Sequence, residues 1–230
     1  MKLAIIYVGA VRESLKSIRR NILELTKCYE QYKPEIIFST WQSAKKPFVI
    51  WGMNYACEYD IELVREQTKG IIDKEVLLEQ NLEDYYRNKG HNGPVTPYYM
   101  LKGIADYLKA ETNLYDYVVI SRHDNLFRIK NVEAYFNDQI YVPPMYWNGG
   151  HKYSEQHISD HFWIMPYHRF LSITTIPDST IANICQQSID NEQFMAHFLN
   201  EIGKKAFIKD EDILTFINRD MPERHWKVSS

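Results

Sequence analysis

The sequence predicts an α/β protein whose mostly parallel central sheet is flanked by helices. Residues 2 to 8 form a nearly continuous apolar run, and residues 35 to 41 form a second one, EIIFSTW. Runs that are apolar on both faces are typical of buried parallel strands. A helical pattern separates the two runs, and such a strand, helix, strand unit joins parallel neighbours through a right-handed crossover. The chain therefore opens as a sheet of the nucleotide-binding type.

The composition indicates a folded protein that does not bind nucleic acid. Of the 230 residues, 45% are hydrophobic and 25% are charged, which is normal for one or at most two globular domains. The 27 basic and 30 acidic residues are spread along the chain and give a net charge of −3. Because no basic tract is present to neutralise a phosphate backbone, nucleic acid is not expected as a partner.

The first residues and the cysteines predict a location in the cytoplasm of a cell or host. The first apolar run reaches Arg12 too soon for a secretory signal, and it is far too short to span a membrane. Cys28, Cys57 and Cys185 are odd in number, scattered and without CxxC spacing. This pattern argues against a disulfide framework and against a structural zinc site.

A helix is predicted after the first strand, because apolar residues recur there every three or four positions while the opposite face is charged. The apolar stripe consists of Leu15, Ile18, Ile22, Leu25 and Tyr29. Pro34 closes this helix before the second strand. Residues 48 to 51 and 60 to 64 are short apolar stretches that could be strands, and their flanks leave their pairing open.

A second helix is predicted to start at Thr96, where the threonine can cap the helix and Pro97 takes the first helical position. Its buried face is expected to consist of Leu101, Ile104, Ala105 and Leu108. The helix leads into YDYVVISRHDNLF at residues 115 to 127, in which an apolar strand ends in three ionisable residues.

The second half of the chain predicts further strands and one more helix. Residues 139 to 142 and 161 to 165 are expected strands, separated by a loop with a proline pair and a glycine pair. Asp190 and Gln193 form a capping box for a helix. The inward face of this helix is expected to be Met195, Phe198, Leu199 and Ile202. A late strand is predicted at residues 206 to 208.

The ionisable residues that follow the central strand are Arg122, His123 and Asp124. In an open α/β sheet, ligands bind beyond the carboxyl ends of the strands, where loops gather polar groups. A carboxylate there can hold a divalent cation, and a guanidinium can fork onto phosphate oxygens. Arg122 and Asp124 therefore predict a phosphate and metal site. The alternative is a salt bridge between these two side chains on the rim of the sheet, and the spacing alone does not decide.

The stretch VVISRHDNLF resembles the segment VIRxRxDxxF of a family of glycosyltransferase-like proteins that build surface polysaccharides and lipopolysaccharides in bacteria and have relatives in large DNA viruses. Three other stretches are similar to the same family, in the same order. YVGAVRE resembles its first strand, IIFSTWQ its second strand, and ISDHFWIMPYHRF its late D-Q-F segment. These stretches span residues 5 to 170, and NEQFMAHFL resembles the final helix of the family.

The resemblance implies a GT-A-like, Rossmann-related fold and the transfer of a sugar from a nucleotide-diphosphate donor to a glycan acceptor. Since no repeat or linker interrupts the chain, one domain is expected, with a nucleotide-binding half at 1–127 and an acceptor-side half at 128–230. The resemblance also implies a divalent metal ion, Mn²⁺ or Mg²⁺, on Asp124. The implied donor-binding residues are Gly9, Arg12, Thr40, Trp41, Arg122 and Asp124.

The sequence departs from the family pattern at three places. Ile120 stands where the family has the first of two arginines, and His161 replaces the glutamine that follows Asp160. The acidic D-x-D of metal-dependent GT-A enzymes is reduced here to the triplet at residues 123–125, which contains a single carboxylate.

Sugar transfer with inversion needs a carboxylate that takes the proton of the acceptor hydroxyl. Asp160 is the predicted base and Glu192 is the second candidate; alternatively, Asp160 caps a turn and Glu192 is favoured by the dipole of its helix. Tyr146 and Trp147 are predicted to bind the acceptor, because aromatic rings in a flexible loop can stack on a sugar. For Trp41, packing in the core is the alternative.

Other functions are less well supported. A non-catalytic glycan-binding or assembly protein on the same fold is the main alternative. His157 and His161 have the spacing of zinc ligands on a helix, but they lie where a loop leads into a strand and lack the adjacent glutamate. A dinucleotide-dependent oxidoreductase is disfavoured because GAVRES, and not G-x-G-x-x-G, follows the first strand.

Overall fold

The computed structural model describes residues 1–9, 15–41, 48–50, 53–55, 61–78, 96–111, 114–123, 125–147, 150–152, 156, 158–159, 162–188 and 191–218. Within these ranges the α-helices are α1 (Leu15–Lys27), α2 (Ile61–Thr68), α4 (Thr96–Ala110), α5 (Tyr167–Ser172), α6 (Asp178–Gln187) and α7 (Asn191–Ile202). The strands are β1 (Leu3–Val8), β2 (Glu35–Trp41), β3 (Phe48–Ile50), β4 (Met53–Tyr55), β5 (Lys74–Leu78), β6 (Tyr117–Arg122), β7 (Asn125–Ile129), β8 (Ile140–Val142), β9 (Met145–Trp147), β10 (Gly150–Lys152), β11 (Phe162–Pro166), β12 (Lys205–Phe207) and β13 (Ile213–Asn218).

Seven of these strands form one central sheet in the order β12-β8-β11-β6-β1-β2-β5. All of them run in the same direction except β11, which is antiparallel to both of its neighbours, β6 and β8. The predicted mostly parallel sheet is therefore confirmed. Because β8 and β6 run the same way, their carboxyl ends lie at the same edge of the sheet as those of β1 and β2. This edge is called the C-terminal edge below.

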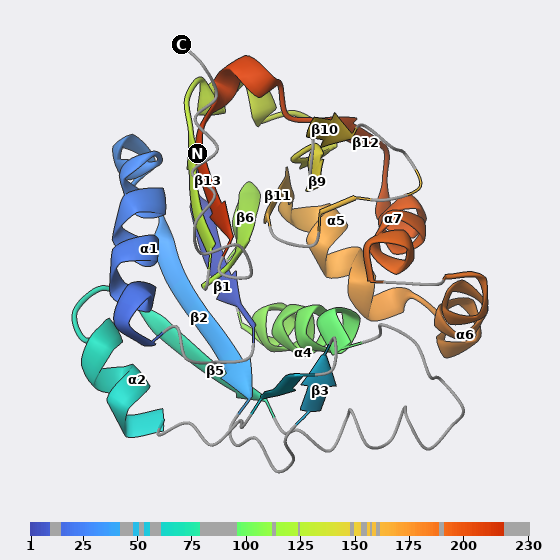
Figure 1. Ribbon diagram of the computed structural model, residues 1–230, viewed down its shortest axis with the longest axis horizontal. Coiled ribbons are helices and arrows are strands. Elements are labelled where there is room, and N and C mark those ends of the chain that lie inside the picture. Colours follow the sequence, from blue (N-terminus) through green and yellow to red (C-terminus); the bar gives the residue numbers. More distant parts are fainter. Residues whose placement is uncertain are drawn as a thin grey trace.

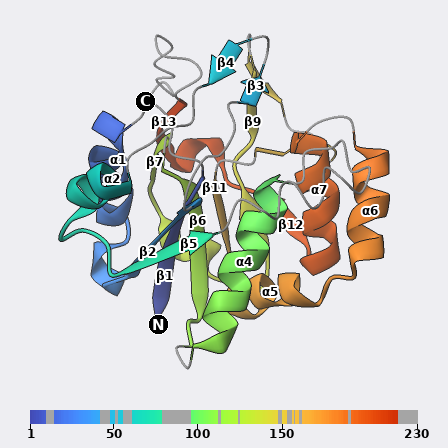
Figure 2. The same ribbon diagram turned by 90° about the horizontal axis from the view of Figure 1, so that it is seen from below.

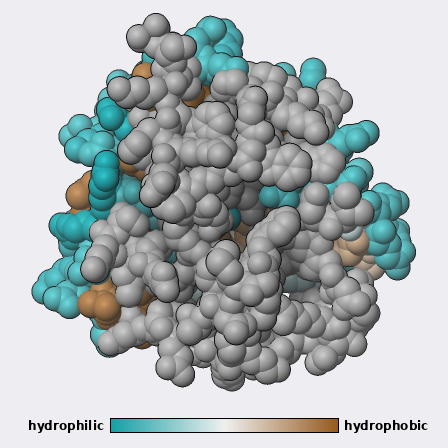
Figure 3. Space-filling view, in the orientation of Figure 1, coloured by the Kyte–Doolittle hydropathy of each residue, from teal (hydrophilic) through white to brown (hydrophobic). Residues whose placement is uncertain are grey.

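Helices cover both faces of the sheet, and each face has its own apolar core (Figure 1). Alternate residues of a strand point to opposite faces, so Ile5 and Phe38 face α1, whereas Ile6 and Ile37 face α4. On the α1 side, Ile18, Ile22 and Leu25 are fully buried, as the predicted stripe requires. Tyr98 of α4 packs edge-on against Phe194 and Phe198 of α7 on the other side. Hydrophilic side chains cover the outer surface over α1 and α2 and over the opposite, α6 side (Figure 3).

The helices and strands with strong local signals lie where the sequence predicts them. Residues 2–41 form the expected parallel strand, helix, strand unit, with β1 paired to β2. In α4 and α7, every residue of the predicted inward faces is buried. The expected strands at residues 139–142, 161–165 and 206–208 correspond to β8, β11 and β12.

Three segments differ from the expectation. Of the possible strand at residues 60 to 64, the described residues 61 to 64 are helical: α2 spans Ile61–Thr68, and its buried residues Val64 and Thr68 are four positions apart, which is a helical spacing. The expected loop between β8 and β11 contains the hairpin of β9 and β10. The C-terminal strand β13 pairs with β7, so Asn218 lies opposite Asn125. That pairing joins segments far apart in the sequence, and no local pattern predicts it.

The described part of the chain also bears on the predictions about membranes and disulfides. No helix in the described ranges is long and apolar enough to cross a membrane. Cys28 and Cys185 are free thiols, and Cys57 lies outside the described residues. Burial raises the pKa of the Cys185 thiol to about 11, so this thiol stays protonated at neutral pH.

Candidate functional site

The C-terminal edge of the sheet is where the predicted site residues converge. Gly9 follows β1, Thr40 and Trp41 end β2, and Arg122 ends β6. The hairpin of β9 and β10 follows the end of β8. In Figure 2 this edge lies at the top and the N-terminus at the opposite end. Figures 1 and 2 together place the β3–β4 and β9–β10 hairpins at the two ends of this edge.

Arg122 is the last residue of β6, and its side chain is half-buried. Strand alternation places it on the same face as Val118 and Ile120, which belong to the core beneath α4. It lies opposite Val8 in the pairing of β1 with β6. A guanidinium at the carboxyl end of a central strand can therefore reach a ligand that binds over the ends of β1 and β6.

His123 does not join Arg122 as part of an exposed cluster. Its side chain is completely buried, and its Nε2 lies 3.0 Å from the carbonyl oxygen of Gly9. The imidazole packs against Phe38 of β2, with the ring centroids 5.4 Å apart. Asn21 of α1 donates its side-chain amide to the carbonyl oxygen of His123 at 3.1 Å. The residues that end this strand therefore differ in position: Arg122 is half-buried, whereas the His123 side chain points into the protein under α1.

Two buried polar side chains at the C-terminal edge have no hydrogen-bond partner among the described residues. The Thr40 hydroxyl is fully buried, and the amide of Asn125 is 2% exposed. An unsatisfied buried polar group costs about 1–3 kcal/mol, which functional sites tolerate more often than cores do. Thr40 faces α1 and Trp41 faces α4, because they alternate along β2.

Trp41 packs in the core on the α4 side and is 3% exposed. Packing in the core was the alternative to nucleotide binding that the sequence left open for Trp41, and the structure places its ring there. As placed, neither Thr40 nor Trp41 offers a solvent-facing surface to a nucleotide.

Glu192 lies in the first turn of α7, half-buried. Its carbonyl oxygen accepts a hydrogen bond from the backbone N–H of Ile158 at 3.3 Å. This contact ties the segment before β11 to the start of α7. Since β11 is antiparallel to β6, it begins at the C-terminal edge, with Phe162 opposite Ser121. Glu192 is therefore near the edge at which Arg122 lies.

The remaining predicted site residues are only partly described. Tyr146 and Trp147 lie in strand β9 and not in the expected loop, and the structure describes their backbone alone. Arg12, Asp124 and Asp160 lie outside the described residues. The same holds for His157 and His161, the pair with zinc-ligand spacing.

The described neighbours of Asp124 do not fit a metal site of the D-x-D type. His123 is buried with its Nε2 at the Gly9 carbonyl, and Asn125 is buried at the start of β7. Asp124, which lies outside the described residues, is therefore the one residue of the triplet left as a candidate metal ligand. Elsewhere in the described ranges, no three His, Cys, Asp or Glu side chains are grouped to hold a metal ion.

Sequence reasoning missed the residues that support the site from inside. Asn21 and His123 connect α1, β1 and the turn after β6, and Asn125 lies buried beyond that turn. Asn21 offered one signal: it is a polar residue next to Ile22 on the apolar side of a helix. A buried polar side chain in that position usually has a specific partner.

Comparisons with known proteins define the fold class. No protein-family model matches the sequence, and no curated protein matches it. The structure is similar to the galactosyltransferase LgtC in complex with donor and acceptor sugar analogs, with a TM-score of 0.52 and 9% identity over 90% of this chain and 73% of that one. An active-site mutant of LgtC gives a TM-score of 0.55 and 9% identity over 91% and 73% of the two chains.

A weaker match is the apo-form glycosyltransferase GlyE in Streptococcus pneumoniae TIGR4, with a TM-score of 0.46 and 10% identity over 92% of this chain and 46% of that one. The likeness to LgtC shows the architecture: an α/β fold with a mostly parallel central sheet flanked by helices, as in GT-A glycosyltransferases. At such low identity, it is the fold that the two chains share.

Proposed function

We propose that this protein is a glycosyltransferase that moves a sugar from a nucleoside-diphosphate sugar to a glycan acceptor. The observation that carries the proposal is the position of Arg122 at the carboxyl end of β6, beside the end of β1, on a GT-A fold. Ligands of open α/β sheets bind at this edge. The fold is that of LgtC, a galactosyltransferase solved with donor and acceptor sugar analogs.

The donor is held by its diphosphate. Arg122 donates its guanidinium N–H groups to the diphosphate oxygens and neutralises the charge that grows on them as the bond to the sugar breaks. Gly9 and Arg12 are the residues proposed to contact the nucleotide, and Thr40 and Trp41 would support that region from within the sheet. Asp124, next to Arg122 in the chain, is the residue that would hold a divalent metal ion, which would supply additional neutralising charge.

The acceptor is activated by a carboxylate. In an inverting reaction the base removes the proton of the acceptor hydroxyl as its oxygen bonds to the anomeric carbon and the nucleoside diphosphate leaves. Asp160 is the proposed base and Glu192 the second candidate, and the link between Glu192 and Ile158 supports a position near the C-terminal edge for this segment. Tyr146 and Trp147 would stack on the apolar face of the acceptor sugar.

The test uses the purified full chain and a panel of UDP-, GDP- and TDP-sugars, with Mn²⁺, with Mg²⁺ and with EDTA. Thermal shifts report donor binding, and released nucleoside diphosphate reports donor cleavage. We expect one nucleotide class to stabilise the protein and to be slowly hydrolysed. If no donor stabilises the chain and none is cleaved, the proposal is refuted. The EDTA arm decides whether a metal ion is needed.

A non-catalytic glycan-binding or assembly protein is the second candidate. It is favoured by the triplet at residues 123–125, which contains a single carboxylate and whose His123 and Asn125 are buried. In that case Asp124→Ala and Arg122→Ala would leave glycan binding intact, and no donor would be cleaved. For the enzyme, both substitutions abolish donor cleavage.

A further inference from the structure

We infer that His123 is a positioning residue that fixes the end of β1 relative to the end of β6, where Arg122 lies, and thereby sets the geometry of the diphosphate site. This inference rests on the proposed function for its catalytic consequence. Its structural part stands on contacts that the described residues make. His123 is fully buried under α1, so its side chain has no solvent-facing surface for a donor or an acceptor.

The side chain of His123 links β1 to the end of β6 just beyond the point where the backbone pairing of the two strands stops. The last paired residues of these strands are Val8 and Arg122. One residue further on, the imidazole Nε2 lies 3.0 Å from the Gly9 carbonyl oxygen. A carbonyl oxygen can only accept a hydrogen bond, so Nε2 carries the hydrogen and donates it. A side chain thus continues the link between the strands after their backbone ladder has ended.

The backbone of His123 is held from the other side by α1. Asn21 is 5% exposed and donates its amide to the His123 carbonyl oxygen at 3.1 Å. The turn after β6 is therefore attached to β1 through the His123 side chain and to α1 through the His123 backbone. Arg122 precedes the attached residue and Asp124 follows it. A shift of His123 would consequently move the adjacent Arg122, the proposed diphosphate ligand.

Gly9 is the residue that this arrangement requires at the end of β1. Its φ of +143° lies in a region that L-amino acids rarely adopt. A Cβ atom on Gly9 would also lie 3.2 Å from His123 Nε2, which is too close without a shift of the ring. The glycine thus allows the imidazole to approach the carbonyl and keeps the contact short.

The binding test compares three variants of the full chain. His123→Leu removes the donor, and His123→Gln keeps an amide N–H that can reach the Gly9 carbonyl. Tyr7→Phe is the control, because the Tyr7 hydroxyl donates to the Ile22 carbonyl at 2.9 Å and also joins β1 to α1, through a hydrogen bond that involves neither His123 nor Gly9. The probes are UDP, GDP and TDP, and the readouts are their dissociation constants and the Tm.

For the nucleotide that binds the wild type, we expect His123→Leu to raise the dissociation constant about tenfold or more, since such a loss corresponds to one buried hydrogen bond and its ordering effect. His123→Gln should stay within about threefold of the wild type. Tyr7→Phe should lower the Tm and leave the dissociation constant unchanged. If the affinity loss merely follows the loss of Tm in all three variants, the inference is overturned.

A second measurement separates this inference from the proposed function. Hydrogen exchange of a peptide covering residues 118–127 reports whether the turn is held, without any ligand. We expect about tenfold faster exchange in His123→Leu and near-wild-type exchange in His123→Gln and Tyr7→Phe. Equal exchange in all variants overturns the positioning role, even if nucleotides bind. If the wild type binds no nucleotide, the proposed function fails and the exchange result still decides about His123. Should His123→Leu not fold, His123→Asn replaces it, because its shorter amide cannot reach Gly9.

Discussion

The two edges of the central sheet differ in how completely their polar side chains are hydrogen-bonded. At the N-terminal edge, Lys74 contacts Glu35 at 3.0 Å and also contacts Glu111, and Tyr115 donates its hydroxyl to Glu35 at 2.8 Å. These side chains form one connected network. At the C-terminal edge, the hydroxyl of Thr40 is buried without a partner in the described part of the chain, although Thr40 lies on the same strand as Glu35.

The difference separates the part of the sheet that stabilises the fold from the part that we propose binds ligands. Satisfied polar networks contribute to stability, whereas each unsatisfied buried group costs about 1–3 kcal/mol. Local departures from good packing rules concentrate at functional sites. Substitutions at one edge should therefore change ligand affinity, and substitutions at the other should change stability.

The largest effect is expected for Arg122→Ala at the C-terminal edge. Charge-assisted hydrogen bonds contribute about 1.5–3 kcal/mol, so the affinity for the nucleoside diphosphate should fall roughly 10- to 150-fold. Because the side chain is half-buried at a strand end, the Tm should change little. Isothermal titration and thermal melts measure the two quantities. A large loss of Tm with unchanged affinity would place Arg122 in the scaffold and not in the site.

The N-terminal edge should respond to Lys74→Met with a loss of stability and no loss of function. The Lys74 side chain is 19% exposed, and its removal leaves Glu35 and Glu111 without their shared cation. We expect the free energy of unfolding to fall by about 2 kcal/mol. Lys102→Met is the control, since its pair with Asp106 is an exposed i,i+4 contact worth a few tenths of a kcal/mol. If the two substitutions lowered the free energy of unfolding equally, the network around Lys74 would contribute no more than an exposed ion pair.

Alkaline pH should weaken the same network. Partial burial lowers the pKa of Lys74, but its hydrogen bonds to Glu111 and Glu35 raise it by more, so the pKa lies above its usual value. Burial and the hydrogen bond to Glu35 raise the pKa of Tyr115. Both groups keep their protons longer in the folded than in the unfolded chain. Their stabilisation is complete below about pH 10 and is lost as the pH rises above it.

Denaturant melts between pH 8 and pH 11 check this prediction. The wild type should lose stability above about pH 10 more steeply than Lys74→Met, because the variant lacks one of the two titrating groups. Parallel curves for the two proteins would contradict the assignment of the alkaline loss to Lys74.

Thr40→Val should stabilise the ligand-free protein, by up to about 1 kcal/mol, because it removes a buried hydroxyl that has no partner among the described residues and keeps the shape of the side chain. Ser39→Ala is the matched control on the opposite face of β2. The Ser39 hydroxyl donates to the Val76 carbonyl at 3.0 Å, so its removal should destabilise by about 1 kcal/mol. Melting curves compare the two. A loss of stability in Thr40→Val would mean that its hydroxyl is satisfied in solution.

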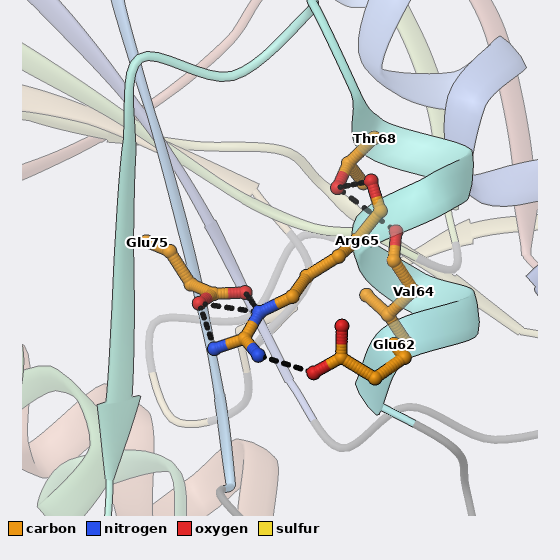
Figure 4. A network of polar contacts seen from close by, with 5 residues as sticks. All are labelled: Glu62, Val64, Arg65, Thr68 and Glu75. Atoms are coloured by element: carbon orange, nitrogen blue, oxygen red, sulfur yellow. Dashed lines mark hydrogen bonds and ion pairs between the residues drawn. The ribbon is translucent and has the colours of Figure 1, made fainter.

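The smallest effect is expected for Arg65→Ala, on the surface of α2. Arg65 binds Glu75 of β5 through two nitrogens and Glu62 of its own helix (Figure 4). Its side chain is 44% exposed, and exposed ion pairs are screened by salt. The Tm should change by less than about 1 °C, and nucleotide affinity should be unchanged. A large change in either would show that ion pairs away from the two edges matter as well.

The parts of the fold with strong local periodicity could be predicted from sequence. The boundaries of β2 coincide with the run EIIFSTW, and the inward face of α7 is the predicted one. The segment around residue 61 was ambiguous, because its few apolar and acidic residues fit a strand as well as a helix. Only Thr68, buried one turn beyond Val64, separates the two readings. The pairing of β13 with β7 depends on tertiary contacts that no local pattern contains.

The candidate site was predictable to the extent that it follows from topology. Arg122 lies at the C-terminal edge because strands of one direction end there, and this direction was readable from the first 41 residues. The direction in which each side chain points could not be predicted from the sequence. His123 could have faced solvent or the core, and the choice depends on Gly9, Asn21 and Phe38, which belong to three other elements. For the same reason, the sequence did not show that Trp41 packs in the core or that Trp147 lies in a hairpin strand.

The pairing of β7 with β13 has a consequence for protein synthesis. β7 is synthesised about ninety residues before its partner β13, so it lacks this partner while the intervening segment is made. Until β13 arrives, Asn125 and the rest of β7 lack their neighbour, so the nascent chain exposes an open strand edge. Because Arg122 lies three residues before the start of β7, the proposed diphosphate site would reach its final geometry only after β13 has docked on β7.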